Sequence, residues 1–363
     1  MIGLYLHIPF CRRKCPYCDF YSVSGQERAF DTYTQALRER LRLCAETYPV
    51  PADTLYFGGG TPSLLGAERL VSLVQAAKDG FGLSEAEITL EVNPEKQDLD
   101  FAALRQGGFN RISIGLQSAN DHELQQLGRL HNAEQAVRCI AQAKAAGFTN
   151  ISLDLMLATP DQTRDTLLRS IAFCAEQEVT HISAYLLKIE PDTPYAHRPD
   201  KALLCDDDRQ AALYLTAVEA LASCGYRQYE ISNFAKEGYE GRHNLKYWHD
   251  EEYLGLGPSA HSFIGGKRFF CDRSFDAFYR HELTMDGTGG DAEEFILLGL
   301  RLTEGITHAR YRERFGTDLP ARLLQKARQL LPTGCLTLTP EGIALTPQGF
   351  LVSNAVIGRL LSD

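Results

Sequence analysis

The sequence predicts an α/β protein: a partial (β/α)6 barrel followed by a C-terminal helical, winged-helix-like module. Two observations predict the barrel. Six short apolar runs alternate with longer stretches whose apolar residues recur every three to four positions. Strands separated by helices imply right-handed βαβ units and a parallel sheet. A third observation, a change of pattern after about residue 206, predicts the appended module.

The expected elements follow one another in a regular order. The strands are Leu4–Ile8, Thr54–Phe57, Ile88–Val92, Arg111–Leu116, Ile151–Leu157 and His181–Leu187. The helices between them include Phe30–Cys44, Ala67–Lys78, Ala133–Ala146 and Thr163–Glu178. Gly147 is placed to end one of these helices, since glycine accepts the left-handed conformation found there. Another helix is expected up to Cys224, followed by a loop over Gly238–Gly266 that is rich in Gly, Tyr and His.

The remainder of the chain is expected to be a small helical unit. Helices are predicted at Asp291–Arg301, His308–Phe315 and Leu319–Leu331, then a hairpin of Cys335–Leu338 and Ile343–Thr346, and a last helix from Pro347. Helices followed by a two-stranded wing are typical of a winged-helix-like module. We therefore divide the chain into a barrel (1–235), a connecting region (236–290) and the C-terminal module (291–363).

Composition excludes several classes of protein. The chain has 37 Lys and Arg against 47 Asp and Glu, a net charge of −10. Nucleic-acid binding needs a basic face, so no nucleic-acid partner is expected. The first residues lack the basic start of a signal peptide, and no apolar run reaches the ~18 residues of a membrane-spanning helix. We expect a reduced, cytoplasmic protein.

Three of the ten cysteines stand apart from the others. Cys11, Cys15 and Cys18 form a C-x3-C-x2-C pattern directly after the first expected strand. Thiolates are suited to zinc or to iron–sulfur clusters. A closed zinc site needs four ligands, which His7 or His122 could complete, whereas three cysteines suit a [4Fe–4S] cluster with one iron open to a small ligand. The scattered cysteines, such as Cys139 and Cys174, are expected to be buried packing residues.

Polar residues recur where the expected strands end. Gly58-Gly59-Gly60-Thr61-Pro62 follows the second strand, and its glycines would allow close backbone approach with N–H groups free for a carboxylate. Glu91 ends the third strand in Glu-Val-Asn-Pro, and Gln117 ends the fourth. Asp154 lies inside the fifth, where a carboxylate needs a partner. Because barrel enzymes build their sites at these strand ends, we expect one common site.

Together these motifs resemble the radical S-adenosylmethionine (radical SAM) superfamily. The resemblance rests on the cysteine triplet after the first strand and on the GGxTP motif, and it extends over nearly the whole chain. It implies a radical SAM barrel in which a [4Fe–4S] cluster on Cys11, Cys15 and Cys18 reduces S-adenosylmethionine, with a ferredoxin or flavodoxin as low-potential electron donor. The residues it implies for S-adenosylmethionine are Tyr5, Tyr17, Gly59, Gly60, Thr61, Glu91, Gln117, Arg129 and Asp154.

Within the superfamily, the chain resembles the oxygen-independent coproporphyrinogen III oxidase group. The opening Tyr5-Leu-His-Ile-Pro-Phe-Cys and the segment Tyr253–His261 carry this likeness. One branch of the group is the oxidase, which decarboxylates two propionates in porphyrin biosynthesis, and the other is a heme chaperone. The oxidase pattern has a fourth cysteine where this chain has Phe20, and an arm where this chain has ten residues. Arg242–Trp248 carries H-N-x-x-Y-W, which is typical of the chaperone branch.

The resemblance therefore implies a heme chaperone that passes heme to acceptor hemoproteins, a membrane-associated respiratory enzyme among them. His243 is the candidate heme ligand, with His249 and His261 as alternatives, because histidine is a common axial ligand. The absence of C-x-x-C-H speaks against attachment of the cytochrome c type. Two alternatives stay open: an oxygen-independent coproporphyrinogen III oxidase (dehydrogenase), and a redox-silent zinc-binding module.

Overall fold

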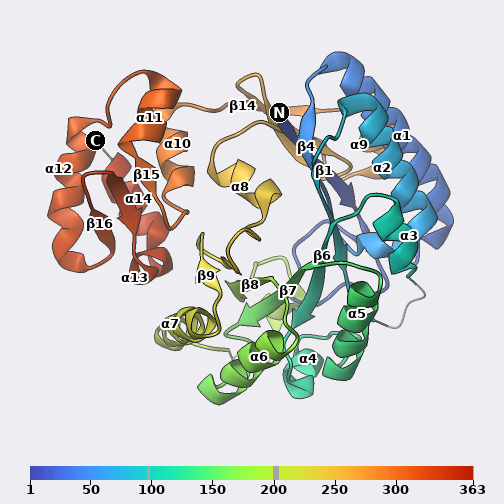
Figure 1. The fold of residues 1–363 in the computed structure, drawn as a ribbon, viewed down its shortest axis with the longest axis horizontal. Helices are drawn as coiled ribbons and strands as arrows, with labels where there is room; N and C mark the ends of the chain where they lie inside the picture. Colours follow the sequence, from blue (N-terminus) through green and yellow to red (C-terminus); the bar gives the residue numbers. More distant parts are fainter. Residues whose placement is uncertain (96–98, 199–203, 363) are drawn as a thin grey trace.

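A computed structural model describes residues 1–95, 99–198 and 204–362, and its centre is a run of six parallel strands (Figure 1). The strands are β1 (Ile2–Ile8), β4 (Ala52–Gly59), β5 (Glu87–Val92), β6 (Arg111–Gln117), β7 (Asn150–Leu157) and β8 (His181–Leu186). Each pairs in parallel with the next in this order. All six predicted strands are thus confirmed, and their carboxyl ends lie along one edge of the sheet.

Helices lie between these strands along the chain, one more follows the last strand, and together they cover the outer face of the sheet (Figure 1). They are α1 (Phe30–Thr47), α2 (Ala67–Phe81), α3 (Phe101–Gln106), α4 (Asp121–Gln126), α5 (Ala133–Ala145), α6 (Arg164–Glu176) and α7 (Asp207–Ser223). β6 is buried along its whole length because helices cover one face while the barrel interior fills the other. Gly147 has a φ of +88° just beyond α5, as the sequence predicts.

The sheet continues beyond both ends of this parallel centre. β10 (Asn233–Ala235) and β9 (Arg227–Gln228) add antiparallel to β8. On the other side, β11 (Tyr253–Leu256) adds parallel to β1 and is followed by antiparallel β12 (His261–Ile264), β13 (Lys267–Phe270) and β14 (Thr284–Thr288). In the described residues the outermost strands, β14 and β9, do not pair with each other. The barrel is therefore partial, as expected.

The prediction of a loop over Gly238–Gly266 is wrong. This segment holds α8 (Arg242–Trp248) as well as β11 and β12, and α8 lies on the concave side of the sheet (Figure 1). These elements are short and owe their stability to partners far away in the sequence. β11 pairs with β1, some 250 residues earlier in the chain, and buries Leu254 and Leu256 there. Local periodicity cannot reveal such a partner.

The C-terminal residues form a separate group of helices around a small sheet (Figure 1). Its helices are α10 (Ala292–Gly299), α11 (His308–Phe315), α12 (Ala321–Leu330), α13 (Pro347–Leu351) and α14 (Ser353–Leu361). Its strands are β15 (Ile306–Thr307), β16 (Leu336–Leu338) and β17 (Gly342–Leu345), and β16 and β17 form the predicted hairpin. The single last helix of the prediction is two helices, because the backbone leaves the helical conformation at Val352.

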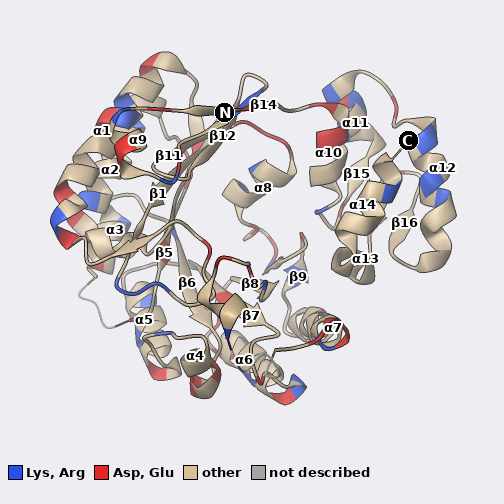
Figure 2. Ribbon diagram, turned by 180° about the vertical axis from the view of Figure 1, so that it is seen from behind, with Lys and Arg blue, Asp and Glu red and all other residues tan. Residues whose placement is uncertain are grey.

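Charged residues lie mainly on the outer helices and loops, and the strands carry few of them (Figure 2). The buried set is dominated by aliphatic and aromatic side chains of the sheet and of the helix faces turned toward it. None of the helices in the described ranges has the combination of length and apolarity that a membrane crossing requires.

Candidate functional site

A pocket opens at the carboxyl ends of the parallel strands, next to the cysteine loop. It encloses about 750 Å³ of space, part of it open to solvent. Eleven of the predicted site residues line it: Cys11, Cys15, Tyr17, Cys18, Gly59, Gly60, Thr61, Glu91, Gln117, Arg129 and Asp154. The fold thus brings together residues from five strands and three loops, and it leaves Tyr5 and His243 outside the lining.

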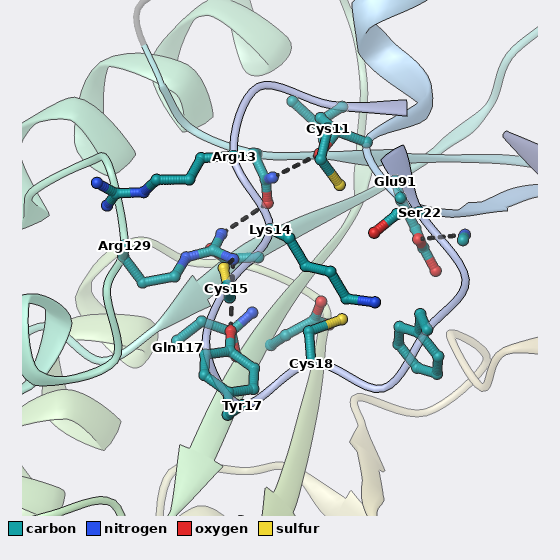
Figure 3. Close-up of a pocket in the computed structure, with 18 of the residues that line it drawn as sticks. Cys11, Arg13, Lys14, Cys15, Tyr17, Cys18, Ser22, Glu91, Gln117 and Arg129 are labelled. Carbon is teal, nitrogen blue, oxygen red and sulfur yellow. Dashed lines mark hydrogen bonds between the residues drawn. The ribbon is translucent and has the colours of Figure 1, made fainter. Parts of the chain in front are cut away.

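The cysteine loop connects β2 (Phe10–Cys11) to β3 (Val23–Ser24), a short parallel pair beside the main sheet. Its three thiols are free and border one pocket (Figure 3). Burial raises the pKa of the Cys11 and Cys18 thiols, so a bound cation is needed to hold them as thiolates near neutral pH. Among the described residues, no group of three metal-ligating side chains lies close enough together to bind a single metal ion. An iron–sulfur cluster does not require this, because each thiolate binds a different iron atom.

Arg129 joins the cysteine loop to the strand ends. Its guanidinium donates to the Asn93 Oδ1 atom at 2.6 Å and to the Gly115 carbonyl at 2.9 Å. It also approaches the Cys15 Sγ atom at 3.6 Å and the Tyr17 hydroxyl at 3.5 Å (Figure 3). The fork geometry of an arginine can satisfy several acceptors at once, so this side chain fixes where Cys15 and Tyr17 lie.

A second connection runs through Asn93, a pocket residue that the sequence analysis missed. The Asn93 amide donates to the Thr61 hydroxyl at 2.8 Å, and that hydroxyl donates to the Cys11 Sγ atom at 3.7 Å. Asn93 therefore binds to Arg129 on one side and to Thr61 on the other. Its position in the Glu-Val-Asn-Pro run, two residues after Glu91, was the available signal.

The glycine turn after β4 is structured differently from the expectation. Its N–H groups are not free for a ligand: Gly60 donates to the Ile8 carbonyl at 2.9 Å and Thr61 to the Phe10 carbonyl at 2.7 Å. The glycines are needed because protein atoms are close. A β-carbon on Gly60 would lie 2.6 Å from the Phe10 carbonyl oxygen. The turn thus packs against the start of the cysteine loop.

Two carboxyl groups, Glu91 on β5 and Asp154 on β7, line the pocket, and each side chain is only partly exposed. Burial raises the pKa of Glu91 to about 7 and that of Asp154 to about 6. The predicted need of Asp154 for a partner is met by the Ser113 hydroxyl, which donates to its Oδ1 atom at 3.2 Å. The two carboxyl groups supply hydrogen-bond acceptors and the Arg129 guanidinium supplies donors, as a ligand that carries both positive and negative groups requires.

Gln117 also lies at the pocket, in an uncommon backbone conformation. Its φ is +68° at the end of β6, and its Oε1 atom accepts from the Tyr185 hydroxyl at 2.8 Å. Tyr185 lines the pocket too, and the sequence analysis missed it. A non-glycine residue with positive φ is held there only by its surroundings, which is common at binding sites.

The histidines considered from the sequence lie elsewhere. His243 is buried with both ring nitrogens engaged, Nδ1 with the Thr54 hydroxyl and Nε2 with the Tyr247 hydroxyl, each at 2.8 Å. His7 is engaged through both nitrogens as well. His122 lies on α4 beside Asp161, and His249 lies between Glu251 and Glu304. His261 is exposed and stacks on Phe270.

Neither histidine proposed to complete a zinc site therefore lines the pocket. The remaining cysteines also divide into two groups. Cys139 and Cys174 are buried, as predicted, and burial raises the pKa of both thiols. Cys224 is exposed and Cys335 is partly exposed, so the expectation of packing roles fails for these two, because each lies at the end of an element rather than on its inner face.

The chain is similar to known proteins over its whole length. The Radical SAM superfamily profile matches residues 5–174, and the HemN C-terminal domain profile matches residues 291–352. The heme chaperone HemW of Bacillus subtilis is 34% identical over the full length of both chains. The heme chaperone HemW of Escherichia coli is 39% identical over 75% of this chain and 71% of its own. Coproporphyrinogen III oxidase (HemN) from Escherichia coli has the same fold, with a TM-score of 0.86, 23% identity, and 99% and 90% of the two chains covered.

Proposed function

The chain belongs to the heme chaperone HemW family of the radical SAM superfamily, and from this premise we propose that it binds heme and transfers it to acceptor hemoproteins. The observation that carries the proposal is the similarity to heme chaperones along the entire chain. We further propose that a [4Fe–4S] cluster and S-adenosylmethionine occupy the pocket at the strand ends.

The donor set of the pocket fits such a cluster. Three free thiols border one space, and no fourth cysteine accompanies them among its lining residues. We propose Cys11, Cys15 and Cys18 as the ligands, with one iron open to a small chelating molecule. When bound and reduced, the cluster supplies single electrons to the sulfonium of S-adenosylmethionine. A ferredoxin or flavodoxin is the proposed source of these electrons.

The other lining residues are the proposed contacts of S-adenosylmethionine. Glu91 and Asp154 are acceptors for its cationic groups, and Arg129 and Gln117 can hold its carboxylate and hydroxyl groups. Tyr17 offers a ring close to Arg129. Because Gly60 and Thr61 use their N–H groups within the protein, the glycine turn is proposed to shape the wall of the pocket rather than to bind the ligand through those groups.

Phe20 supports the chaperone over the oxidase. It occupies the place of the fourth cysteine in the oxidase pattern, lines the pocket, and is 68% exposed. A phenyl ring carries no thiol, so the chain departs from the oxidase pattern at this position of the pocket. The likeness to the oxidase structure, at 23% identity, concerns the fold alone.

Parallel assays on the anaerobically reconstituted protein test the proposal. Titration with heme should give a saturable, stoichiometric Soret shift, and the loaded protein should pass heme to an added apo-hemoprotein. Incubation with reductant, S-adenosylmethionine and coproporphyrinogen should give no product. Absence of a saturable Soret shift contradicts the chaperone, and formation of protoporphyrinogen would assign the protein to the oxidase instead.

A further inference from the structure

Three ring side chains stack against one another beneath the pocket, with His243 buried and Tyr5 and Tyr56 partly buried. Tyr5 comes from β1, Tyr56 from β4 and His243 from α8, and we call these three residues the aromatic layer. The rings of Tyr56 and His243 are 5.2 Å apart and inclined by 25°. The Tyr5 ring lies 6.1 Å from Tyr56 and 6.4 Å from His243, again nearly parallel. Stacked rings in a packed interior cannot move independently.

The aromatic layer is held from below by α8. Besides the two hydrogen bonds of the His243 ring, the buried Glu87 carboxylate accepts the N–H groups of Arg242 at 3.1 Å and His243 at 3.0 Å. The Lys246 ammonium, itself largely buried, pairs with Asp53 at 2.9 Å and with Glu251 at 2.8 Å. These bonds join α8 to β4 and β5, so the helix has a fixed position under the pocket.

One connection leads from the aromatic layer up to the pocket wall. The Tyr56 hydroxyl donates to the Glu91 Oε1 atom at 2.8 Å, and the Gly59 N–H approaches the other carboxylate oxygen at 3.3 Å. Glu91 lines the pocket, whereas Tyr56 does not. Tyr56, whose ring stacks on His243, therefore sets the orientation of the Glu91 carboxylate.

A second connection leads to the cysteine loop. The Tyr5 hydroxyl bonds the His7 Nδ1 atom at 3.1 Å, and the His7 Nε2 atom bonds the Tyr21 carbonyl at 2.8 Å. Tyr21 is three residues beyond Cys18. Burial lowers the pKa of His7 to about 4, so the ring is neutral, with Nε2–H donating to the carbonyl and Nδ1 accepting from Tyr5.

We propose that the aromatic layer positions residues of the cofactor pocket. Tyr56 orients Glu91 toward S-adenosylmethionine, and Tyr5, through its hydrogen bond to His7, fixes the end of the cysteine loop at Tyr21. The inference rests on the proposed cofactor binding. It gives the H-N-x-x-Y-W segment on α8 a role that requires no contact with heme. Tyr5 and His243 are then positioning residues, which accounts for their location outside the pocket lining.

The test replaces Tyr56 with phenylalanine in the reconstituted full-length protein. Tyr56→Phe keeps the stacked ring and removes only the hydroxyl that Glu91 accepts. We expect the dissociation constant for S-adenosylmethionine to rise about tenfold, the effect of losing one hydrogen bond to a charged group, at unchanged iron and sulfide content. Tyr226→Phe is the matched control, since its buried hydroxyl donates to the Val179 carbonyl at 2.9 Å away from the pocket.

The pH profile of binding separates positioning from a general structural effect. Burial, the largest cause, and the Asp154 charge raise the pKa of Glu91, while the Tyr56 hydrogen bond, the Gly59 N–H and the Arg111 charge lower it. Removing the hydroxyl should therefore shift the pH below which affinity falls to a higher value. An unchanged affinity and pH profile in Tyr56→Phe would overturn the inference.

A His243→Ala variant provides the second measurement. We expect it to weaken S-adenosylmethionine binding, as Tyr56→Phe does, because the ring under Tyr56 is lost. Loss of heme binding with unchanged S-adenosylmethionine affinity would overturn the inference and identify His243 as a heme contact. If the wild-type protein binds no S-adenosylmethionine at all, the proposed cofactor binding fails first, and the inference fails with it.

Discussion

Replacing Gly59 with alanine tests the packing between the glycine turn after β4 and the His7 ring on β1. Gly59 has a φ of +111°, which side chains rarely adopt, and a β-carbon there would lie 2.5 Å from the His7 ring. The ring cannot retreat without giving up its bonds to Tyr5 and to the Tyr21 carbonyl. Backbone strain of about 1–3 kcal/mol and overpacking of about 1–3 kcal/mol together predict a loss of about 2–6 kcal/mol.

The assay is urea unfolding of the protein without cofactors, followed by iron and sulfide analysis after reconstitution. Gly82→Ala is the matched control because Gly82 also has a positive φ, +58°, but has no neighbour within 4 Å of the added carbon. It should lose only about 1–2 kcal/mol, the strain alone. Both substitutions stiffen the unfolded chain equally, so the difference between them reports the clash together with the greater backbone strain at φ +111°. If Gly59→Ala is no less stable than Gly82→Ala, the reasoning about His7 is refuted.

Three further predictions concern the cysteine loop, the buried carboxyl and the helix below the pocket. Cys15→Ala should abolish the cluster absorbance and keep the far-UV circular dichroism, whereas Cys224→Ala, at an exposed cysteine, should keep both; an intact cluster in Cys15→Ala would contradict the ligand assignment. Asp154→Asn should stabilise the cofactor-free protein by about 2–3 kcal/mol at pH 8 and should have no effect near pH 3.5. The reason is that the folded-state pKa of Asp154, about 6, lies above the usual 3.8, so the wild-type protein loses stability as the pH rises from the lower to the higher value. Equal free energies of unfolding for the two proteins at pH 8 would count against this prediction. Lys246→Met should cost about 1–3 kcal/mol in urea unfolding, because it removes the largely buried ammonium from Asp53 and leaves that carboxylate only the Arg242 guanidinium, 3.7 Å away. Lys188→Met, in an exposed pair, should leave the free energy of unfolding essentially unchanged, and similar losses in both variants would show that burial of the pair is unimportant.

Much of the site could be predicted from sequence because its signals are local. The C-x3-C-x2-C spacing places three thiols on one short loop, whatever surrounds it. Glu91, Gln117 and Asp154 follow or end parallel strands, and parallel strands present their carboxyl ends at one edge. These two facts account for six of the eleven predicted residues that line the pocket, and the resemblance to the radical SAM superfamily implied the other five, Arg129 among them.

Asn93 and Tyr185 show where local signals end. Each binds a residue that was predicted, Arg129 and Gln117, but over sequence separations of 36 and 68 residues. A hydrogen bond between distant elements depends on how the strands are ordered and twisted, and the pattern around either residue does not contain that information. Tyr5 shows the opposite case. The family resemblance implied that it contacts the cofactor, whereas in the fold its ring lies against Tyr56 and His243 and does not line the pocket.

By itself, then, the sequence determined the six βα units, the C-terminal hairpin and the cysteine loop, because period and spacing express short-range geometry. The tertiary structure alone decided that the segment over Gly238–Gly266 is a helix and two strands, and that His243 lies inside the barrel rather than at a surface. The reason is energetic: α8 and β11 are too short to be stable alone, and their partners on β1, β4 and β5 lie 150 or more residues away.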